Sequence, residues 1–184
     1  GSTLGVNMVW HEAFGQAYNP LTSEEEENII SLKVNSQRMW QHINPILSDI
    51  QALPECIETL TMTDDLQSGN HFMRTYKKAD QSEVMIDIAM GAPSYFKFLK
   101  IPLQGKEVNG DAEGTVYVSE AFRQQLDKDN VQDRVEIEGQ SYRIIGIFKE
   151  LYKETQGRAT IGSVFFPSNH FRYFYVKLAP STNA

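Results

Sequence analysis

The chain has 184 residues, of which 41% are hydrophobic and 22% charged, so it can bury a core and is not an intrinsically disordered chain. Its 17 Lys and Arg residues against 24 Asp and Glu residues give a formal net charge of -7. This acidic balance argues against broad nucleic-acid binding and against docking on anionic membranes, since both use clusters of Lys and Arg.

The N-terminal part of the chain predicts a short helix followed by a strand. Thr22 or Ser23 is expected to cap a helical turn, with a glutamate three residues further on. The acidic run at 24–27 is interpreted as a solvated turn rather than a metal cluster, because carboxylates suit a helix start. The β-branched stretch "IISLKV" at 29–34 predicts a strand.

A helix and a second strand come next. In "NPILSDIQALP", Asn44 is a good N-cap and Pro45 would fill the first helical position, where its missing N–H is not needed. Pro54 ends this helix, and residues 36–43 stay ambiguous because they also fit an earlier helical turn. The alternating segment "IETLTMT" at 57–63 predicts a strand. The helix is expected to present one apolar stripe, formed by Ile46, Leu47, Ile50 and Leu53.

Together these segments read as a strand, a helix and a strand, a βαβ-like unit. After the loop "DDLQSGNH" the pattern changes to densely spaced short strands. "FMRTYKK" and "EVMIDIAM" predict two strands around a polar turn at 79–82, and "PSYFKFLKI" predicts a helix that starts at Pro93.

The C-terminal half continues in the same style. "TVYVSEAFRQQL" predicts a strand that runs into a helix capped by Ser119, with Ala121, Phe122 and Leu126 facing inward. "DRVEIEGQSYRIIGIFKEL" predicts a hairpin that turns at Gly139-Gln140. "SVFFP" and "FRYFYVKLAP" predict two more strands, and the last one has apolar residues on both faces, as in a central strand covered on both sides.

The pair Gly105-Lys106 in "APSYFKFLKIPLQGKEV" raises the question of a phosphate-binding loop. Such a loop needs two spaced glycines, then Lys followed by Ser or Thr at a helix start. Here Glu107 follows the lysine and places a carboxylate where phosphate would sit. Gly105 is therefore interpreted as a backbone hinge between a helix and a short strand.

No other motif predicts catalysis or metal binding. The four histidines are widely separated, and neither Asp64-Asp65 nor Asn109-Gly110-Asp111 fits a calcium loop. Cys56, the single cysteine, has no motif around it, although His42 or His71 could supply a base in space; it is interpreted as a buried small residue. We therefore expect no catalytic, cofactor-binding or metal-binding residue and no cofactor. The histidines are His11, His42, His71 and His170.

Taken in order, four segments resemble the extracytoplasmic core domain of MacB/FtsX-type ABC transporter permeases. "PSYFKFLKIPLQGKEV" resembles the family's aromatic helix that leads to a glycine turn, and "VYVSEAFRQQL" resembles its strand and helix. "DRVEIEGQSYRIIGIFKEL" resembles its hairpin, with Gly146 at the family's glycine, and "SVFFP" matches the strand that ends in proline, here Pro167. The resemblance departs at Ser119, where Asn is common, and at Glu150, near the family's Asp.

The resemblance implies a non-enzymatic function. The domain would lie on the periplasmic side of the bacterial inner membrane, anchored by membrane helices of a longer protein. It would couple ATP hydrolysis by a cytoplasmic ATPase domain or subunit to movement of a peptide, lipid or lipoprotein. Further implied partners are a second permease copy and an extracytoplasmic protein, with no nucleic acid. The alternatives are a stand-alone peptide- or lipid-binding module and, from another class, a small hydrolase that uses Cys56 or a carboxylate.

The expected fold is α+β in two lobes within a single domain, 1–184. A βαβ-containing, porter-like lobe would comprise 1–66 and 164–184, and an inserted β-rich lobe would comprise 67–163. Gly1-Ser2 looks like a cloning remnant, with no signal peptide and no apolar run of membrane-spanning length. In the family a helix and a strand usually follow the last strand, so we expect the first lobe to continue beyond the given chain and to leave apolar surface uncovered.

Overall fold

The protein is described from a computed structural model. It describes residues 21–66, 72–108, 112–150, 154–155 and 158–180. The helices are α2 (Ser23–Glu27), α3 (Gln37–Gln41), α4 (Ile43–Gln51), α5 (Tyr95–Phe98) and α6 (Glu120–Lys128). The strands are β1 (Ile29–Lys33), β2 (Cys56–Met62), β3 (Phe72–Lys77), β4 (Glu83–Gly91), β5 (Leu103–Gly105), β6 (Thr115–Ser119), β7 (Arg134–Ile137), β8 (Gln140–Phe148), β9 (Glu154–Thr155), β10 (Arg158–Ala159), β11 (Ser163–Pro167) and β12 (Tyr173–Leu178).

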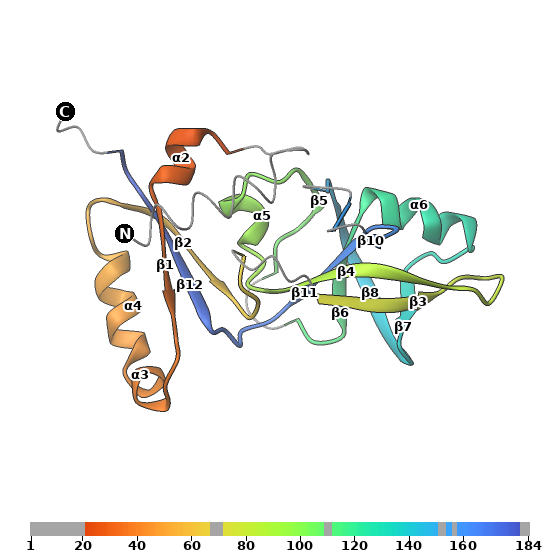
Figure 1. Cartoon of the computed structure of the whole chain (residues 1–184), viewed down its shortest axis with the longest axis horizontal. Coiled ribbons are helices and arrows are strands. Elements are labelled where there is room, and N and C mark those ends of the chain that lie inside the picture. The colour runs from red at the N-terminus through yellow and green to blue at the C-terminus, as the bar shows by residue number, and fades with distance from the viewer. Residues whose placement is uncertain (1–20, 67–71, 109–111, 151–153, 156–157, 181–184) are drawn as a thin grey trace.

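One mixed sheet of ten strands runs along the length of the molecule (Figure 1). Its order is β1-β12-β2-β4-β11-β6-β8-β5, with β3 paired to β4 and β7 paired to β8, while β9 and β10 form a separate pair. Long mixed sheets with few helices are typical of the α+β class. The predicted fold class is therefore confirmed.

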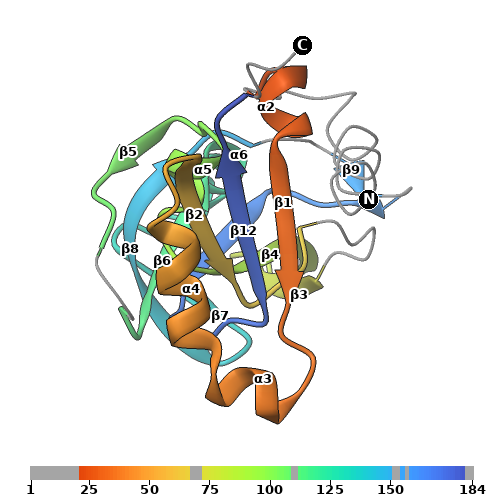
Figure 2. The ribbon, with the colours of Figure 1, turned by 90° about the vertical axis from the view of Figure 1, so that its left-hand side faces the viewer.

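The first end of the sheet consists of β1, β12 and β2. Both β1 and β2 pair antiparallel with β12, so they run parallel to each other with β12 between them. This is the predicted βαβ-like unit, with the last strand inserted at its centre. Helix α4 covers one face, as Figure 2 shows, and its Ile43 and Leu47 pack against Phe174 and Val176 of β12. The central position predicted for this strand is confirmed, because Phe174 and Tyr175, which point to opposite faces, are both fully buried.

Helix α4 differs in detail from the prediction. It begins at Ile43 with His42 as its N-cap, so Pro45 is the third helical residue, still within the first turn. Ile46 and Leu53 are 39% and 47% exposed, against the predicted inward stripe. The reason is that Ile43, Leu47 and Ile50 already form the inward i, i+4, i+7 row.

The helical elements on either side of β1 clarify two open points. Thr22, rather than Ser23, is the N-cap of α2 and forms a capping box with Glu25. The ambiguous segment before α4 contains the short helix α3, capped by the Ser36 hydroxyl. Met39 of this helix packs against the same apolar cluster as α4.

The other end of the sheet curls around α6. Starting from β3, the strands β4, β11, β6, β8 and β7 follow in order, and the curl brings β7 back beside β3. Phe122 and Leu126 of α6 are buried in the core enclosed by these strands. Ser119 caps α6 as predicted, and its hydroxyl also accepts a hydrogen bond from the Ser163 amide at 2.9 Å. Ala121, expected inside, is exposed, because α6 already buries Phe122 and Leu126 four residues apart.

The β7–β8 hairpin turns one residue earlier than predicted. Its loop is Glu138-Gly139, since Ile137 pairs with Gln140. Both loop residues have positive φ, at 48° and 82°, as a two-residue type I′ turn requires.

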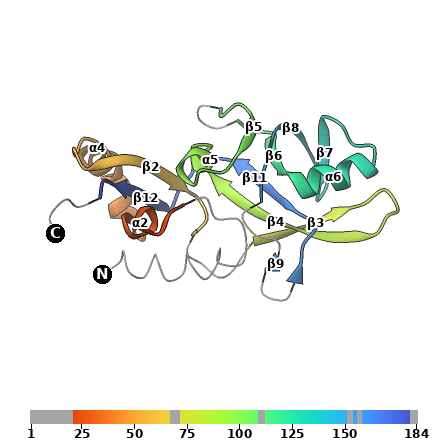
Figure 3. The same cartoon turned by 90° about the horizontal axis from the view of Figure 1, so that it is seen from above.

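The two ends of the sheet meet at a narrow junction. β2 pairs with β4 only between Met62 and Gly91, and α5 lies over this junction (Figure 3). A single apolar cluster crosses it, with Leu60 and Met62 from one side and Phe96, Tyr117 and Phe165 from the other. The expected lobes are therefore not separate sheets, and β11, expected from residue 164 in the first lobe, pairs with β4 and β6. The division into 1–66 plus 164–184 and 67–163 stays a proposal.

Candidate functional site: the junction of β2, β12 and α5

The Gly105-Lys106 pair belongs to the edge of the sheet. Gly105 ends β5 and pairs with Gly146 of β8. The hydroxyl of the buried Tyr117 donates to the Lys106 carbonyl at 2.8 Å and accepts from the Val108 amide at 3.2 Å. This stretch is thus a helix-to-strand connection held by a core tyrosine, as interpreted from the sequence.

The other residues weighed from the sequence do not come together. His42 is the N-cap of α4, His170 lies between β11 and β12, and half-buried Cys56 packs on the apolar cluster under α4. His11, His71 and Asn109-Gly110-Asp111 lie outside the described residues. Among the residues that the structure describes, no three His, Cys, Asp or Glu side chains are placed to share a metal ion. The expectation of no catalytic, cofactor or metal residue stays a prediction.

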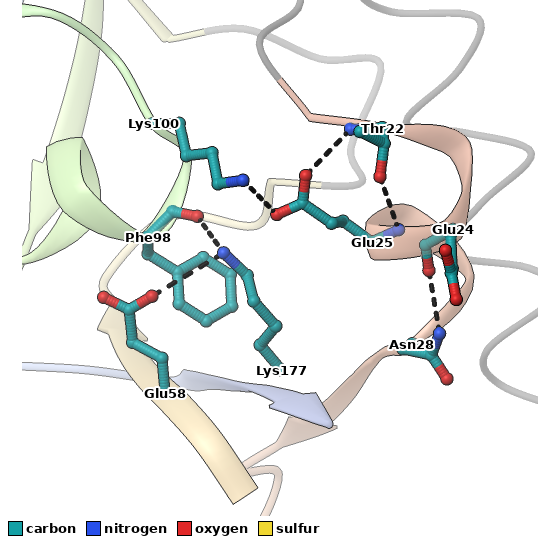
Figure 4. A network of polar contacts seen from close by, with 8 residues as sticks. All are labelled: Thr22, Glu24, Glu25, Asn28, Glu58, Phe98, Lys100 and Lys177. Carbon is teal, nitrogen blue, oxygen red and sulfur yellow. Dashed lines mark hydrogen bonds and ion pairs between the residues drawn. The ribbon is translucent and has the colours of Figure 1, made fainter. Parts of the chain in front are cut away.

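The polar feature that stands out is the side chain of Lys177 in β12, which lies between Glu58 of β2 and Phe98 of α5 (Figure 4). The residue is only 5% exposed, and its Nζ donates a hydrogen bond of 2.6 Å to the carbonyl of Phe98, the last residue of α5. The same Nζ lies 3.6 Å from a carboxylate oxygen of Glu58 in β2 and 4.6 Å from the centre of the Phe98 ring. Burial lowers the pKa of Lys177, and the Glu58 carboxylate offsets part of that shift.

A second ion pair joins α2 to the residues after α5. Lys100 Nζ lies 2.6 Å from a carboxylate oxygen of Glu25. The other carboxylate oxygen accepts the Thr22 amide hydrogen bond of the capping box, at 3.1 Å. Burial alone would raise the pKa of Glu25, but Lys100 and the Thr22 hydrogen bonds outweigh it and lower the pKa. Helix α5 and the residue pair after it are thus attached to β12, β2 and α2.

At the other end of β2, two aspartates connect the junction to β4 and β12. Asp64 Oδ2 accepts a hydrogen bond of 2.7 Å from the Met90 amide, and burial raises the pKa of Asp64 to about 6. The Tyr175 hydroxyl donates to Asp65 Oδ1 at 3.0 Å and accepts from the Leu66 amide at 2.8 Å. The junction is therefore connected by polar contacts on both sides of its shared apolar cluster.

This arrangement is closely connected by both polar contacts and ring packing. Its charged groups pair with one another or with backbone groups between different elements, and the aromatic rings beneath them are closely packed. Phe96 lies 4.8 Å from Tyr117 and 5.0 Å from Phe165, between ring centres. A core packed in this way resists compression.

Sequence reasoning missed this site. The available signal was a lysine in the strand "FYVKL", on the same side as the inward-facing Tyr175. A charged residue at such a position requires a buried partner. Its partners, Glu58 and the Phe98 carbonyl, are distant in sequence and follow only from the topology.

Comparison with known proteins gives a family match. A family model described as the MacB-like periplasmic core domain matches residues 9–184.

The chain belongs to this family.

As a MacB-like periplasmic core domain, it is an extracytoplasmic domain of ABC transporter permeases, not a member of an enzyme family. The resemblance stated from the sequence is thereby confirmed. A search of curated proteins returned no match.

Solved structures share the fold of this MacB-like domain. The periplasmic region of MacB from Actinobacillus actinomycetemcomitans superposes with a TM-score of 0.52 at 12% identity, covering 85% of this chain and 77% of that one. The extracellular domain of the noncanonic ABC-type transporter YknZ from Gram-positive bacteria gives 0.52 at 13% identity, covering 85% and 86%. Among the described helices of this MacB-like domain, none is long and apolar enough to span a bilayer.

Proposed function

We propose that this domain transmits movement produced by cytoplasmic ATP hydrolysis to a substrate outside the membrane. The chain would be held at the periplasmic face of the inner membrane by membrane helices of the full-length permease. An ATPase domain or subunit would act through those helices, beside a second permease copy and an extracytoplasmic partner protein. The moved substrate would be a peptide, a lipid or a lipoprotein.

The observation that carries this proposal is the doubly connected junction. β1, β12 and β2 form one end of the sheet, and in this proposal that end is the one attached to the membrane helices. The Lys177 hydrogen bond to Phe98 and the cluster around Phe96 join these strands to α5 and the far end of the sheet. A domain that acts as a lever needs a stiff connection between the end attached to the membrane helices and the end that acts on the substrate.

The test uses the full-length permease with its ATPase in lipid nanodiscs. In a Cys56→Ser background, Asp49→Cys on α4 and Gln124→Cys on α6 carry spin labels at the two ends of the domain. We expect the Asp49–Gln124 label distance to stay constant between nucleotide-free and vanadate-trapped states. The distance from either label to a third label in a membrane helix should change by several ångströms, as in rigid-body domain motion.

Two outcomes would contradict the proposal. If the domain kept its distance to the membrane helices in every nucleotide state, it would not move with the ATPase. If instead the Asp49–Gln124 distance changed with nucleotide, the domain would flex within itself and not act as a lever. A permease with a hydrolysis-deficient ATPase is the matched control. Its distance from either domain label to the membrane-helix label should stay at one value and not alternate between the two.

A further inference from the structure

The strands β3 and β7 lie beside each other at the place where the curled end of the sheet fails to close. Within the described part of the chain, β3 pairs with β4 alone and β7 with β8 alone. Following strand directions through β4, β11, β6 and β8 shows that β3 and β7 run antiparallel. Two strand edges therefore face each other at a seam and lie close together over part of their length, without a described strand ladder between them.

The backbone groups that face this seam follow from the hydrogen-bond register. The Lys78 amide donates to the Ser82 carbonyl, so Lys78 belongs to the alternating set that bonds to β4. Thr75 and Lys77 belong to the other set and direct their amides and carbonyls outward. On β7, the Ile144 amide donates to the Asp133 carbonyl. By the same rule, the backbone amide and carbonyl of Glu136 point away from β8, toward the seam.

A side chain is hydrogen-bonded to one of these outward-facing backbone groups. The Thr75 amide donates to Glu138 Oε1 at 3.1 Å, across the seam from the β7–β8 turn. The Glu138 carboxylate therefore accepts the hydrogen bond that a backbone carbonyl of a neighbouring strand would accept at the edge of β3. Free strand edges bind extended peptides by adding a strand, unless side chains protect them.

Next to this contact lies a cavity of about 370 Å³ between the two edges, within the range of ligand sites. Its far wall is the end of α6, where Asp129 accepts hydrogen bonds from the Tyr76 hydroxyl at 2.7 Å and the Ala79 amide at 3.1 Å. Four carboxylates and two ammonium groups line it: Glu83, Asp129, Glu136, Glu138, Lys77 and Lys78. The balance is acidic.

We propose that this seam binds an extended, basic segment of a partner polypeptide. The segment pairs with the outward backbone of Lys77 and displaces the Glu138 carboxylate, together with the adjoining β7–β8 turn, from the edge of β3, since an added strand lies about 4.8 Å from its neighbour. Glu138 and Glu136 then pair with basic side chains that alternate along the bound strand, since neighbouring side chains of one face lie two residues apart. This proposal is independent of the proposed transport function. Its test uses the 184-residue chain and a peptide, without membrane helices or an ATPase.

The probe is a short fluorescein-labelled peptide in which lysine and valine alternate, titrated with the 184-residue chain at low salt and followed by anisotropy. We expect saturable binding and slower hydrogen exchange at the Thr75 and Lys77 amides. A peptide of equal charge with proline at every second valine cannot form a ladder and should bind at least about tenfold more weakly. A glutamate-valine peptide should not bind.

Two variants locate the site. Glu136→Lys should weaken binding at least about tenfold, whereas Glu120→Lys at the exposed start of α6 makes the same charge change outside the seam and should stay within about twofold. Thr75→Pro removes an outward amide and a weak contact of the Thr75 hydroxyl with Met85 Sδ, which an edge strand tolerates. It should abolish the peptide-induced exchange protection of the Lys77 amide while circular dichroism stays unchanged.

Equal binding of the proline peptide, or equal weakening by both lysine variants, would overturn the proposal and show general attraction to an acidic protein. No binding of the lysine-valine peptide would overturn it as well. If Thr75→Pro does not fold, the comparison of Glu136→Lys with Glu120→Lys still decides the outcome.

Discussion

Lys177 and Asp64 show how single ionisable residues are accommodated at the junction. Taking an ammonium out of water costs several kcal/mol unless hydrogen bonds and a counter-charge replace the lost hydration. For Lys177 the Phe98 carbonyl and Glu58 supply both, so its side chain fixes the position of α5 relative to β12. Asp64 has one strong amide donor, Met90, and its charge is stabilised less well.

Asp64 therefore makes the stability of the domain depend on pH. Burial raises its pKa from an ordinary 3.8 to about 6, so between these values the folded protein holds a proton that the unfolded chain releases. The stabilising contribution of this carboxyl is complete below about pH 4 and is lost as the pH rises through 6. Above that pH the folded state contains an incompletely solvated carboxylate.

We predict that Asp64→Asn stabilises the domain at pH 7.5 by about 1 kcal/mol, allowing for the partial exposure of the side chain. The amide oxygen of Asn can still accept the Met90 hydrogen bond. Urea unfolding at pH 7.5 and at pH 4 measures the effect, and the gain should shrink toward zero at the lower pH. Asp49→Asn, on the exposed face of α4, removes the same charge and serves as the control without such a trend. A loss of stability at pH 7.5 would show that Asp64 is stabilised by contacts other than these.

At the scale of elements, the edge strand β5 depends on two glycines that face each other. A Cβ on Gly146 would lie 2.7 Å from Tyr117 Cδ1 and 3.0 Å from the Gln104 carbonyl oxygen. A Cβ on Gly105 would lie 2.6 Å from the Ile145 carbonyl oxygen. The close approach of β5 and β8 over the Tyr117 ring thus requires glycine on both strands.

We predict that Gly146→Ala lowers the free energy of unfolding by about 2–3 kcal/mol, because the buried Tyr117 ring cannot move away without disturbing the core. Gly114→Ala is the control: its Cβ would meet open space, so only the strain of its positive φ remains, roughly 1 kcal/mol. Chemical denaturation gives both values. Equal losses for the two variants would mean that the β5–β8 approach is not tight.

Elements that depend on interactions between residues close in sequence could be predicted, whereas elements that depend on residues distant in sequence could not. Local signals placed the β3–β4 and β7–β8 hairpins and the caps at Thr22 and Ser119 close to their observed positions, since turn residues and caps act over a few positions. The family resemblance added the identity of the domain. The alternation in β12 correctly predicted burial on both faces.

Features that depend on tertiary contacts could not be predicted from the sequence. The choice of Ile43 rather than Leu53 for the inward face of α4 depends on where β12 lies beneath it. The pairing of Lys177 with Phe98 joins residues 79 positions apart. The placement of β11 between β4 and β6 follows from crossover connections that no local pattern specifies.

At the scale of the whole molecule, the shared apolar cluster decides whether the two ends of the sheet behave as one body. Their direct backbone pairing is limited to Met62 and Gly91. Phe96 of α5, 1% exposed, belongs to a cluster that also contains Leu60 and Met62 on one side of the junction and Phe165 on the other. Stability in this geometry comes from side-chain packing more than from the strand ladder.

We predict that Phe96→Ala destabilises both ends of the molecule together, by about 3–5 kcal/mol, because it opens a cavity in the shared cluster. Hydrogen exchange followed by mass spectrometry should show equal loss of protection in peptides from β12 and from β7–β8, as in a single cooperative unit. Ile46→Ala, at an exposed position of α4, is the matched control and should leave both protections within about 0.5 kcal/mol. Phe96→Leu should give the same pattern at a smaller amplitude. Loss of protection confined to β7–β8 would instead establish 67–163 as an independently unfolding lobe, and the first lobe would then hold its structure without the packing of α5.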